Sequence, residues 1–197
     1  MCHAPRVTVL VPCGPVVEAV PRVIALRMPT VTVVRTYLEL RSLEQLRDDG
    51  AAAPGITLHE THPCPLSLSR ALYQGVGAQY HWTDRDEISD EEMTAYLARD
   101  TVRVVVARSA GRDDGFFELV RHDDGSVEIA MFGLFPHAHG RGLGKWLLVQ
   151  AARTAFAWGA TRTWLHTCTL DAPAALPNYR ARGFTPCGTE TYETVVA

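Results

Sequence analysis

The chain has 197 residues, of which 47% are hydrophobic, 21% charged and 8% aromatic, and its formal net charge is −3. This length is sufficient to bury one substantial hydrophobic core. The charge balance is not typical of a strongly basic nucleic-acid surface or of an acidic disordered chain. Lys145 is the only lysine, and the other 18 basic residues are arginines, a bias that we attribute to the codon usage of a GC-rich genome.

The cysteines and the apolar segments indicate where the protein works. The five cysteines, at positions 2, 13, 64, 168 and 187, form no CxxC motif. They favour reduced cytoplasmic thiols over a disulfide scaffold or a zinc site. The most apolar stretch, residues 7–28, is interrupted by prolines and charges, so it is neither a membrane span nor a secretory signal. We therefore expect a soluble cytoplasmic protein with no metal site and no membrane contact.

Residues 1–30 differ in composition from the rest of the chain. They contain five prolines, with short β-prone pieces between them. We expect an N-terminal extension that packs as an irregular strand or arm, and a homodimer contact is one hypothesis for its role. Residues 31–197 are expected to form a single domain.

The domain is predicted to begin with a strand. Residues 31–40 alternate and are rich in β-branched side chains, which is typical of a strand. The sequence Ser42-Leu-Glu-Gln has the pattern of a capping box and predicts a short helix to about Asp48. A second short strand is predicted at 56–59.

Two helices are expected next. Leucines at positions 66, 68 and 72 predict a helix over 65–75, which ends at glycines. Ser89-Asp-Glu-Glu predicts the start of another helix that continues to Arg99, with Met93, Tyr96 and Leu97 on one face.

The second half of the domain alternates strands and helices. The turn Asp123-Asp-Gly is expected to join two of the strands into a hairpin. In chain order, we predict strands at 102–107, 116–120 and 127–134, a long amphipathic helix at 142–158, a strand at 163–167, a helix at 172–182 and a last strand from 184. This order predicts a mixed α+β fold around a central sheet.

A glycine-rich segment, Phe132-Gly-Leu-Phe-Pro-His-Ala-His-Gly-Arg-Gly-Leu-Gly-Lys145, connects a strand to the long helix. Glycine allows positive φ and close approach of a ligand to the backbone. The first turn of a helix presents unpaired N–H groups and the positive end of the dipole. Together with Arg141 and Lys145, these features predict an anion cradle suited to a pyrophosphate. A dinucleotide-binding turn and a loop without ligand remain open, although the late position argues against the former.

The glycine segment resembles the acetyl-coenzyme A signature of the GCN5-related N-acetyltransferases (GNAT), Gln/Arg-x-x-Gly-x-Gly/Ala. Residues 139–144 match it with one departure, because His139 stands where Gln or Arg is usual. The preceding hydrophobic-x-hydrophobic-x-Pro pattern of the family is present at 132–136. Residues 174–184 resemble the family segment Ala-x-x-x-Tyr-x-x-x-Gly-Phe, with Tyr179 at the tyrosine position. The resemblance covers about residues 31–197.

The resemblance implies a GNAT-like, mostly antiparallel sheet with a splayed strand pair, flanked by helices. It also implies transfer of an acyl group from acetyl-CoA, or another acyl-CoA, to an amine by direct attack in a ternary complex. In the family, most phosphate contacts are backbone amides, and a backbone N–H near residues 132–134 stabilises the developing oxyanion. The implied donor-binding residues are Phe132, Gly133, Leu134, His139, Gly140, Arg141, Gly142, Leu143, Gly144 and Lys145.

Acyl transfer needs a base for the attacking ammonium and an acid for the leaving thiolate. The resemblance implies that Tyr179 is the acid, and packing of its helix is the alternative role. Glu128 is one candidate base, and its alternative is a surface pair with Arg121 across the hairpin. His166 is the other candidate base, because imidazole titrates near neutral pH, and a buried hydrogen-bonded histidine is its alternative. Cys168 is interpreted as a small buried thiol rather than a nucleophile.

The acceptor site is predicted from a loop and a neighbouring strand. Residues 80–85 are dense in aromatic and charged side chains, of which Tyr80, Trp82 and Asp84 are candidate substrate contacts. The alternative is that Trp82 fixes this loop in the core. Glu118 is a candidate contact for a cationic substrate.

The leading hypothesis is an acyl-CoA-dependent N-acyltransferase that acts on the amine of a small molecule. One alternative keeps the fold and takes the acyl group from an aminoacyl-tRNA, although the net charge of −3 gives it no support. Another alternative is a non-catalytic acyl-CoA-binding sensor. The presence of Tyr179 together with the glycines favours catalysis.

Overall fold

The computed structural model describes residues 30–50 and 53–195. The proline-rich segment 1–29, with its hypothetical dimer contact, lies outside the described residues. In chain order the elements are β1 (Thr30–Leu40), the 3-10 helix η1 (Leu43–Gln45), β2 (Ile56–Thr61), α1 (Leu66–Gly77), α2 (Asp90–Leu97), β3 (Val102–Ser109), β4 (Arg112–Arg121), β5 (Ser126–Leu134), the 3-10 helix η2 (Pro136–Ala138), α3 (Leu143–Ala157), β6 (Arg162–Cys168), α4 (Ala175–Ala181) and β7 (Thr185–Val195).

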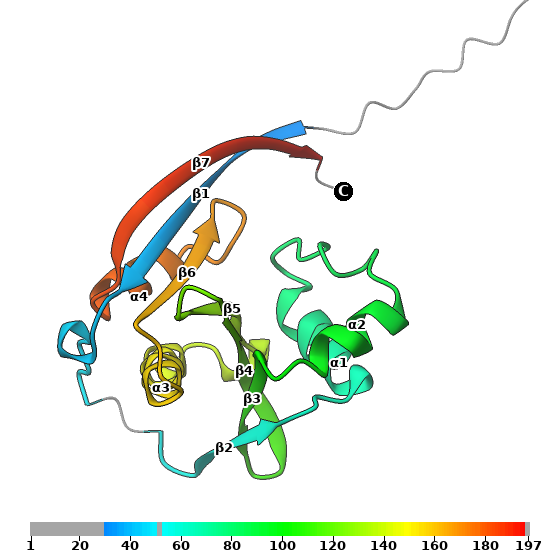
Figure 1. Cartoon of the computed structure of the whole chain (residues 1–197), viewed down its shortest axis with the longest axis horizontal. Coiled ribbons are helices and arrows are strands. Elements are labelled where there is room, and N and C mark those ends of the chain that lie inside the picture. The colour runs from blue at the N-terminus through cyan, green and yellow to red at the C-terminus, as the bar shows by residue number, and fades with distance from the viewer. Residues whose placement is uncertain (1–29, 51–52, 196–197) are drawn as a thin grey trace, which may run out of the picture.

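The strands form one seven-stranded sheet in the order β2-β3-β4-β5-β6-β1-β7. The pair β5–β6 is parallel, as the crossover through α3 requires, and the other neighbours are antiparallel. Helices α3 and α4 cover one face of the sheet, and α1 and α2 cover the other (Figure 1). The predicted mixed α+β fold is therefore confirmed.

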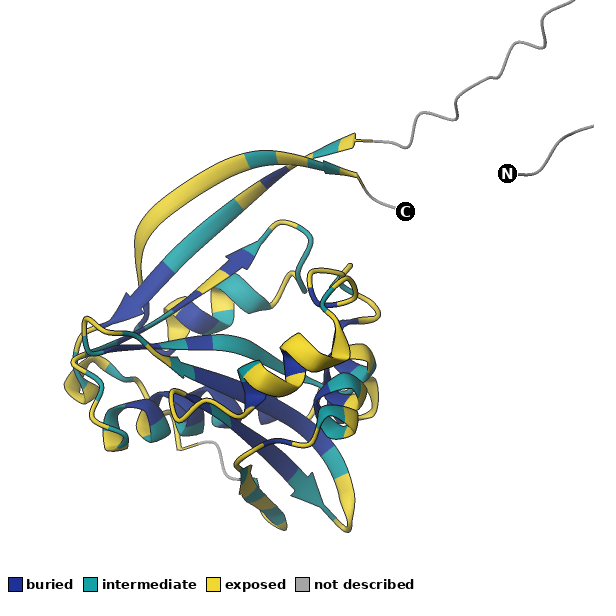
Figure 2. Cartoon of the chain, turned by 45° about the vertical axis from the view of Figure 1, so that its right-hand side comes forward, coloured by how far each residue is buried: buried dark blue, intermediate teal, exposed yellow. Residues whose placement is uncertain are grey.

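Two apolar clusters hold the layers together. Phe117, Leu147 and Leu165 belong to the cluster between the sheet and the α3–α4 side. Leu72 and Met93 belong to the cluster under α1 and α2. Each such side chain stabilises the fold by roughly 1.5–3 kcal/mol when it is removed from water. The central strands are largely buried, whereas most of β7 at the sheet edge is exposed (Figure 2).

The serines at two predicted helix starts have different roles. At α2, Ser89 Oγ accepts a hydrogen bond from the Glu92 N–H at 3.2 Å and the Glu92 carboxylate accepts one from the Ser89 N–H. The predicted helix start is confirmed, and these two bonds form a capping box. At Ser42 the short helix begins as predicted, but the predicted capping box is wrong: Ser42 makes no side-chain cap, and the side chain of Gln45 accepts from the N–H of Arg41. The 3-10 helix ends at Gln45, because the next residues turn outward and the N–H of Arg47 donates to the backbone beyond α4.

Strand β4 begins four residues earlier than predicted. It pairs with β3 as far as Ser109 opposite Arg112, around a tight turn in which Ala110 and Gly111 both have positive φ. The polar residues at the start of β4 are paired within the sheet: Asp114 is fully buried and accepts from the Ser109 hydroxyl. Among the described helices, none has the length and apolar character needed to cross a bilayer.

Candidate active site

A pocket opens where two neighbouring strands separate. β5 and β6 are paired only over Ser126–Glu128 and Arg162–Trp164. In β5, Ala130 forms a bulge, because Ile129 and Met131 pair with adjacent residues of β4. Beyond this point a pocket of about 1080 Å³ lies between the strands. Its walls include the α1–α2 loop, the first turn of α3, the start of α4, and parts of β1 and β7.

The glycine segment forms one end of this pocket. Gly140 and Gly142 have φ values of 73° and 74°, and Gly142 is the N-cap of α3. A Cβ atom at either position would meet no other atom within 4 Å. Glycine is therefore needed here for its backbone conformation, and the space beside the turn is open. The first turn of α3, from Leu143 to Lys145, lines the pocket with the positive end of the helix dipole.

The backbone of β5 offers hydrogen-bond donors to the pocket. The N–H of Phe135 donates to the carbonyl of Asp114 in β4 at 3.0 Å. Since successive peptide groups of a strand point in opposite directions, the N–H groups of Phe132 and Leu134 face away from β4, toward the gap. The carbonyl of Leu134 accepts a hydrogen bond from Nε2 of the His139 ring at 3.1 Å. The N–H of Gly133 points toward β4. Of the three backbone N–H groups expected to stabilise the oxyanion, only those of residues 132 and 134 therefore face the gap.

The two basic residues of the glycine segment lie in different places. Lys145 lines the pocket, and its Nζ is 3.7 Å from Asp49. Asp49 also pairs with Arg182, a pocket residue that the sequence analysis did not select. The side chain of Arg141 does not line the pocket; it points toward Asp114, with a separation of 3.7 Å. The contribution of Arg141 to the anion cradle stays a prediction.

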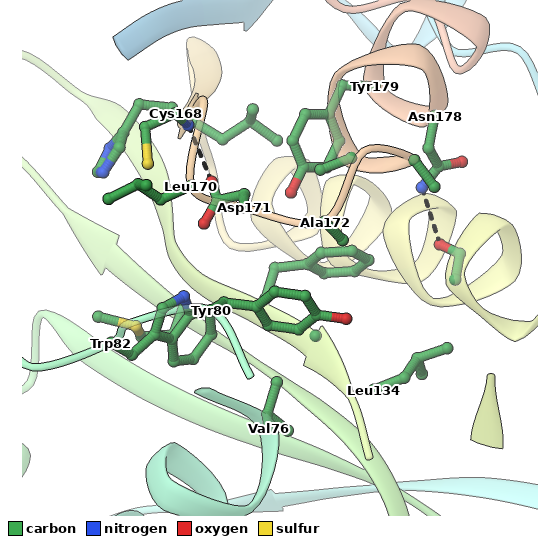
Figure 3. Close-up of a pocket in the computed structure, with 18 of the residues that line it drawn as sticks. Val76, Tyr80, Trp82, Leu134, Cys168, Leu170, Asp171, Ala172, Asn178 and Tyr179 are labelled. Atoms are coloured by element: carbon green, nitrogen blue, oxygen red, sulfur yellow. Dashed lines mark hydrogen bonds between the residues drawn. The ribbon is translucent and has the colours of Figure 1, made fainter. Parts of the chain in front are cut away.

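Tyr179 projects from α4 into the pocket (Figure 3). Its ring packs edge-on against Phe132, with centroids 6.0 Å apart. Burial, and secondarily the charge of Asp171, raise the pKa of the Tyr179 hydroxyl well above its usual range, so it carries its proton at neutral pH. Asn178, which the sequence analysis missed, ties α4 to α3 through a hydrogen bond from Nδ2 to the Gly144 carbonyl at 3.3 Å (Figure 3).

The two candidate bases lie side by side, but only His166 lines the pocket. Nδ1 of His166 is 3.8 Å from Oε1 of Glu128, and the other carboxylate oxygen is 3.1 Å from Nε2 of His122. Burial, followed by the charge of Arg35, lowers the pKa of His166. Burial raises the pKa of Glu128, while the hydrogen bond from His122 opposes this shift.

The alternative pairing of Glu128 with Arg121 is wrong. The guanidinium of Arg121 stacks on the ring of Trp158 at 4.3 Å and donates to the carbonyl of that residue. Arg121 pairs with Val127 in the β4–β5 ladder, so its side chain lies on the sheet face opposite Glu128. His122 provides the partner instead.

Three predicted acceptor residues lie in the α1–α2 loop and line the pocket: Tyr80, Trp82 and Asp84. Tyr80 and Trp82 lie on the side of the pocket opposite Tyr179 (Figure 3). Trp82 also packs on Tyr73, with centroids 5.5 Å apart, and directly over Gly77, where a Cβ would clash. Both interpretations of Trp82 thus apply, since it fixes the loop and lines the pocket.

Glu118 has a structural position instead of the predicted substrate contact. Its side chain is 1% exposed and does not line the pocket. Arg85 donates to both of its carboxylate oxygens, at 2.6 and 2.8 Å, and Tyr96 donates a third hydrogen bond. The carboxylate is saturated by these partners, so the prediction for Glu118 is corrected. Arg70 secures the same loop by donating to two of its backbone carbonyls.

The sequence analysis did not identify the strand residues Arg35 and Tyr192 as part of the pocket. The guanidinium of Arg35 stacks on Tyr192 at 4.9 Å. These residues reach the pocket because β1 and β7 curve over it, and no local pattern signals that curvature. Cys168 also lines the pocket, and burial raises the pKa of its thiol, which disfavours the nucleophilic thiolate.

The chain is similar in sequence to a family of acetyltransferases and to uncharacterized N-acetyltransferases. The model of the "Acetyltransferase (GNAT) family" matches residues 67–184. An uncharacterized N-acetyltransferase of Mycobacterium tuberculosis is 33% identical over 105 residues, which cover 53% of this chain and 67% of that protein. A relative from Mycobacterium bovis aligns to the same extent.

Solved structures share the fold. A GCN5-related N-acetyltransferase from Kribbella flavida has a TM-score of 0.59 at 21% identity, covering 83% of this chain and 58% of that one. One from Sphaerobacter thermophilus has a TM-score of 0.61 at 17% identity, with coverages of 85% and 53%. An aminoglycoside acetyltransferase from an uncultured soil sample, in complex with sisomicin, has a TM-score of 0.54 at 14% identity, with coverages of 65% and 87%. This chain therefore spans little more than half the length of the first two structures. From the family match over residues 67–184, the chain belongs to the GNAT acetyltransferase family.

Proposed function

We propose that this protein is an acyl-CoA-dependent N-acyltransferase, with acetyl-CoA as the expected donor and the amine of a small molecule as the acceptor. The observation that carries the proposal is the composition of one pocket. It has a glycine turn with a helix N-terminus at one end, and a neutral histidine and a protonated tyrosine farther along. These are the groups that direct transfer between a thioester and an amine requires.

The residues present fit an acyl-CoA. Gly140 and Gly142 leave open space beside an anion-attracting helix end, and Lys145 adds a positive charge. The N–H groups of Phe132 and Leu134 face the gap and are suited to a chain of amides and to an acyl oxygen. When bound, the donor would supply an activated acyl thioester.

Two side chains would handle the protons. Since Nδ1 of His166 faces Glu128, Nε2 is the nitrogen available to take a proton from the acceptor ammonium. The lowered pKa of His166 keeps that nitrogen unprotonated at neutral pH. The Tyr179 hydroxyl, which keeps its proton because it is buried, is suited to donate it to the leaving sulfur.

The acceptor would lie under the α1–α2 loop. Asp84 provides a carboxylate, and the faces of Trp82 and Tyr80 provide aromatic surface, a combination that suits a cationic amine. The structural likeness to an aminoglycoside acetyltransferase bound to sisomicin supports a small-molecule amine without identifying it. We further propose a cytoplasmic location, which the free thiols of Cys64, Cys168 and Cys187 support.

The proposal is tested by a thiol-release screen. The full chain would be incubated with acetyl-, propionyl- or succinyl-CoA and a panel of amines, amino acids and aminoglycosides. We expect amine-dependent thiol release with at least one pair, and a rise in Tm with the same acyl-CoA in the absence of amine. An absence of thermal stabilisation at millimolar concentrations of every acyl-CoA would overturn the donor assignment.

A further inference from the structure

Three ionisable side chains form a row that leads from the pocket to the outer end of the β4–β5 hairpin. His166 lines the pocket, Glu128 lies behind it, and His122 lies beyond Glu128. The side chain of Glu128 is 15% exposed, whereas those of the histidines are 37% and 39% exposed. The row therefore has an acidic centre that is nearly buried and an imidazole on each side of it.

We propose that His122 is a positioning residue for the transfer reaction, acting through Glu128 on His166. It holds the Glu128 carboxylate so that one oxygen faces Nδ1 of His166. This arrangement keeps the proton of the neutral imidazole on Nδ1 and leaves Nε2 free for the acceptor. The inference rests on the proposed function, in which His166 takes the proton of the attacking amine.

The two carboxylate oxygens of Glu128 are divided between the two rings. Oε2 lies 3.1 Å from Nε2 of His122, within hydrogen-bond distance, and Oε1 lies 3.8 Å from Nδ1 of His166. The longer separation exceeds that of a hydrogen bond, and such contacts shorten in the reacting complex as the imidazole gains charge. A carboxylate that orients a catalytic imidazole in this way stabilises the imidazolium without itself accepting the proton.

The fold fixes this row at the point where β5 and β6 separate. Glu128 is the last residue of β5 that pairs with β6, opposite Trp164. His166 lies two residues farther along β6, on the same face as Trp164 and beside the open gap. The ring of His122 packs on Trp164, with centroids 5.5 Å apart, and the indole N–H donates to Ser126 Oγ at 3.3 Å. His122 is thereby held against the carboxylate from the side away from the pocket.

Charged groups surround each member of the row. The pKa of His166 responds to the charges of Arg35 on β1, Glu190 on β7, Asp171 in the loop after β6 and Asp84 in the α1–α2 loop. The ring of Tyr37 packs beside His166. The pKa of Glu128 responds to His122, to Glu118 on β4 and to Arg85 in the α1–α2 loop. Tyr96 on α2 also interacts electrostatically with Glu128. Asp124 faces His122 from the hairpin turn.

The direction of the pKa shifts agrees with the geometry. Burial and the negative charge of Glu118 raise the pKa of Glu128, and His122 supplies the first opposing influence. Without a donor at position 122, Glu128 would bind a proton at higher pH. It would then no longer orient Nδ1 of His166 as an ionised acceptor.

The test compares four substitutions in the full chain, with an acyl-CoA and amine pair found by the screen. In His122→Phe, which keeps a ring on Trp164 but has no donor, we expect kcat to fall about 10-fold, less than the roughly 10²–10⁴-fold that a positioned acid or base itself contributes. We also expect the acidic limb of the kcat/KM profile to move to higher pH, because activity also requires an ionised Glu128 and the pKa of Glu128 rises further without His122. The donor KM should not change. His122→Gln restores a donor and should recover most of kcat and the wild-type profile. His59→Gln, an exposed histidine of β2, is the control and should change neither.

The outcomes separate the two proposals. If His166→Ala leaves kcat unchanged, the assigned base of the proposed function fails, and this inference fails with it. If His166→Ala loses activity but His122→Phe keeps the wild-type kcat and pH profile, only the role of His122 is overturned. If His122→Phe lowers Tm and activity but His122→Gln fails to restore the profile, His122 is a packing residue and the inference is likewise overturned.

Discussion

Arg85 donates two hydrogen bonds to the carboxylate of Glu118, at 2.6 and 2.8 Å, and both side chains are almost fully buried. Arg85 belongs to the loop that carries Tyr80, Trp82 and Asp84, and Glu118 belongs to the central strand β4. The buried pair therefore fastens the wall of the acceptor pocket to the middle of the sheet. The charges of Glu118 and Arg85 also act on the pKa of Glu128.

Removing one member of this pair should be costly. We expect Arg85→Met to lower the free energy of unfolding by about 3–5 kcal/mol, because it leaves the Glu118 charge buried without its partner. The double variant Arg85→Met/Glu118→Leu should recover a large part of this loss. Arg112→Met, at the exposed start of β4, is the matched control. Urea unfolding measures all three, and equal losses in the single and double variants would contradict this role of the pair.

Two substitutions of Gly142 should differ in whether acetyl-CoA still stabilises the protein. At Gly142 the φ of 74° disfavours any side chain, so Gly142→Ala and Gly142→Glu should both lower the Tm of the protein alone. Gly142→Ala should still be stabilised by acetyl-CoA, since a Cβ there meets nothing within 4 Å. Gly142→Glu should lose the stabilisation because it places a carboxylate at the proposed phosphate site. Differential scanning fluorimetry makes the comparison, and equal ligand-induced shifts in both variants would contradict the site.

Tyr179→Phe should separate proton donation from packing. The variant keeps the ring that packs on Phe132 and removes only the hydroxyl that points into the pocket. We expect kcat to fall about 100-fold, the lower end of the range for general acid catalysis, with little change in the donor KM. Steady-state kinetics measures kcat and the donor KM separately. An unchanged kcat would show that another group protonates the sulfur.

The lowered pKa of His166 sets the expected pH dependence. A base is active when it is unprotonated, so a lowered pKa extends activity toward acid and places the acidic limb of kcat/KM below about 6.5, the ordinary pKa of histidine. Arg35→Gln removes a positive charge that lowers this pKa and should move the limb to higher pH. Arg112→Gln again serves as the control. A limb that does not respond to Arg35→Gln would argue that His166 is not the titrating base.

The sequence predicted those helices and strands that a few consecutive residues are enough to specify. The Ser89 capping box, the glycine turn before α3 and the alternation of β1 are each written within a few residues, and the structure contains all three elements. The same kind of pattern failed at Ser42, where contacts with the backbone after α4, about 140 residues farther along, end the helix early. Sequence distance, rather than residue chemistry, limited the prediction there.

The candidate site shows the same limit. Its residues were found where a motif carries them, as at Gly140, Gly142 and Tyr179. The positions of Glu118 and Arg121 depended on which face of the sheet each side chain occupies and on partners from distant elements. His122 and Arg35 carried no local signal, because their neighbours come from other strands.

The central claim is that one pocket brings an acyl-CoA and an amine together for direct transfer. Two-substrate initial-rate kinetics tests it most directly, with thiol release and acylated amine measured in parallel. We predict that thiol is released in equal amount to acylated amine, and that double-reciprocal lines intersect, as a ternary complex requires. Parallel lines, the pattern of a covalent acyl-enzyme, or thiol release that does not depend on the amine would contradict the account.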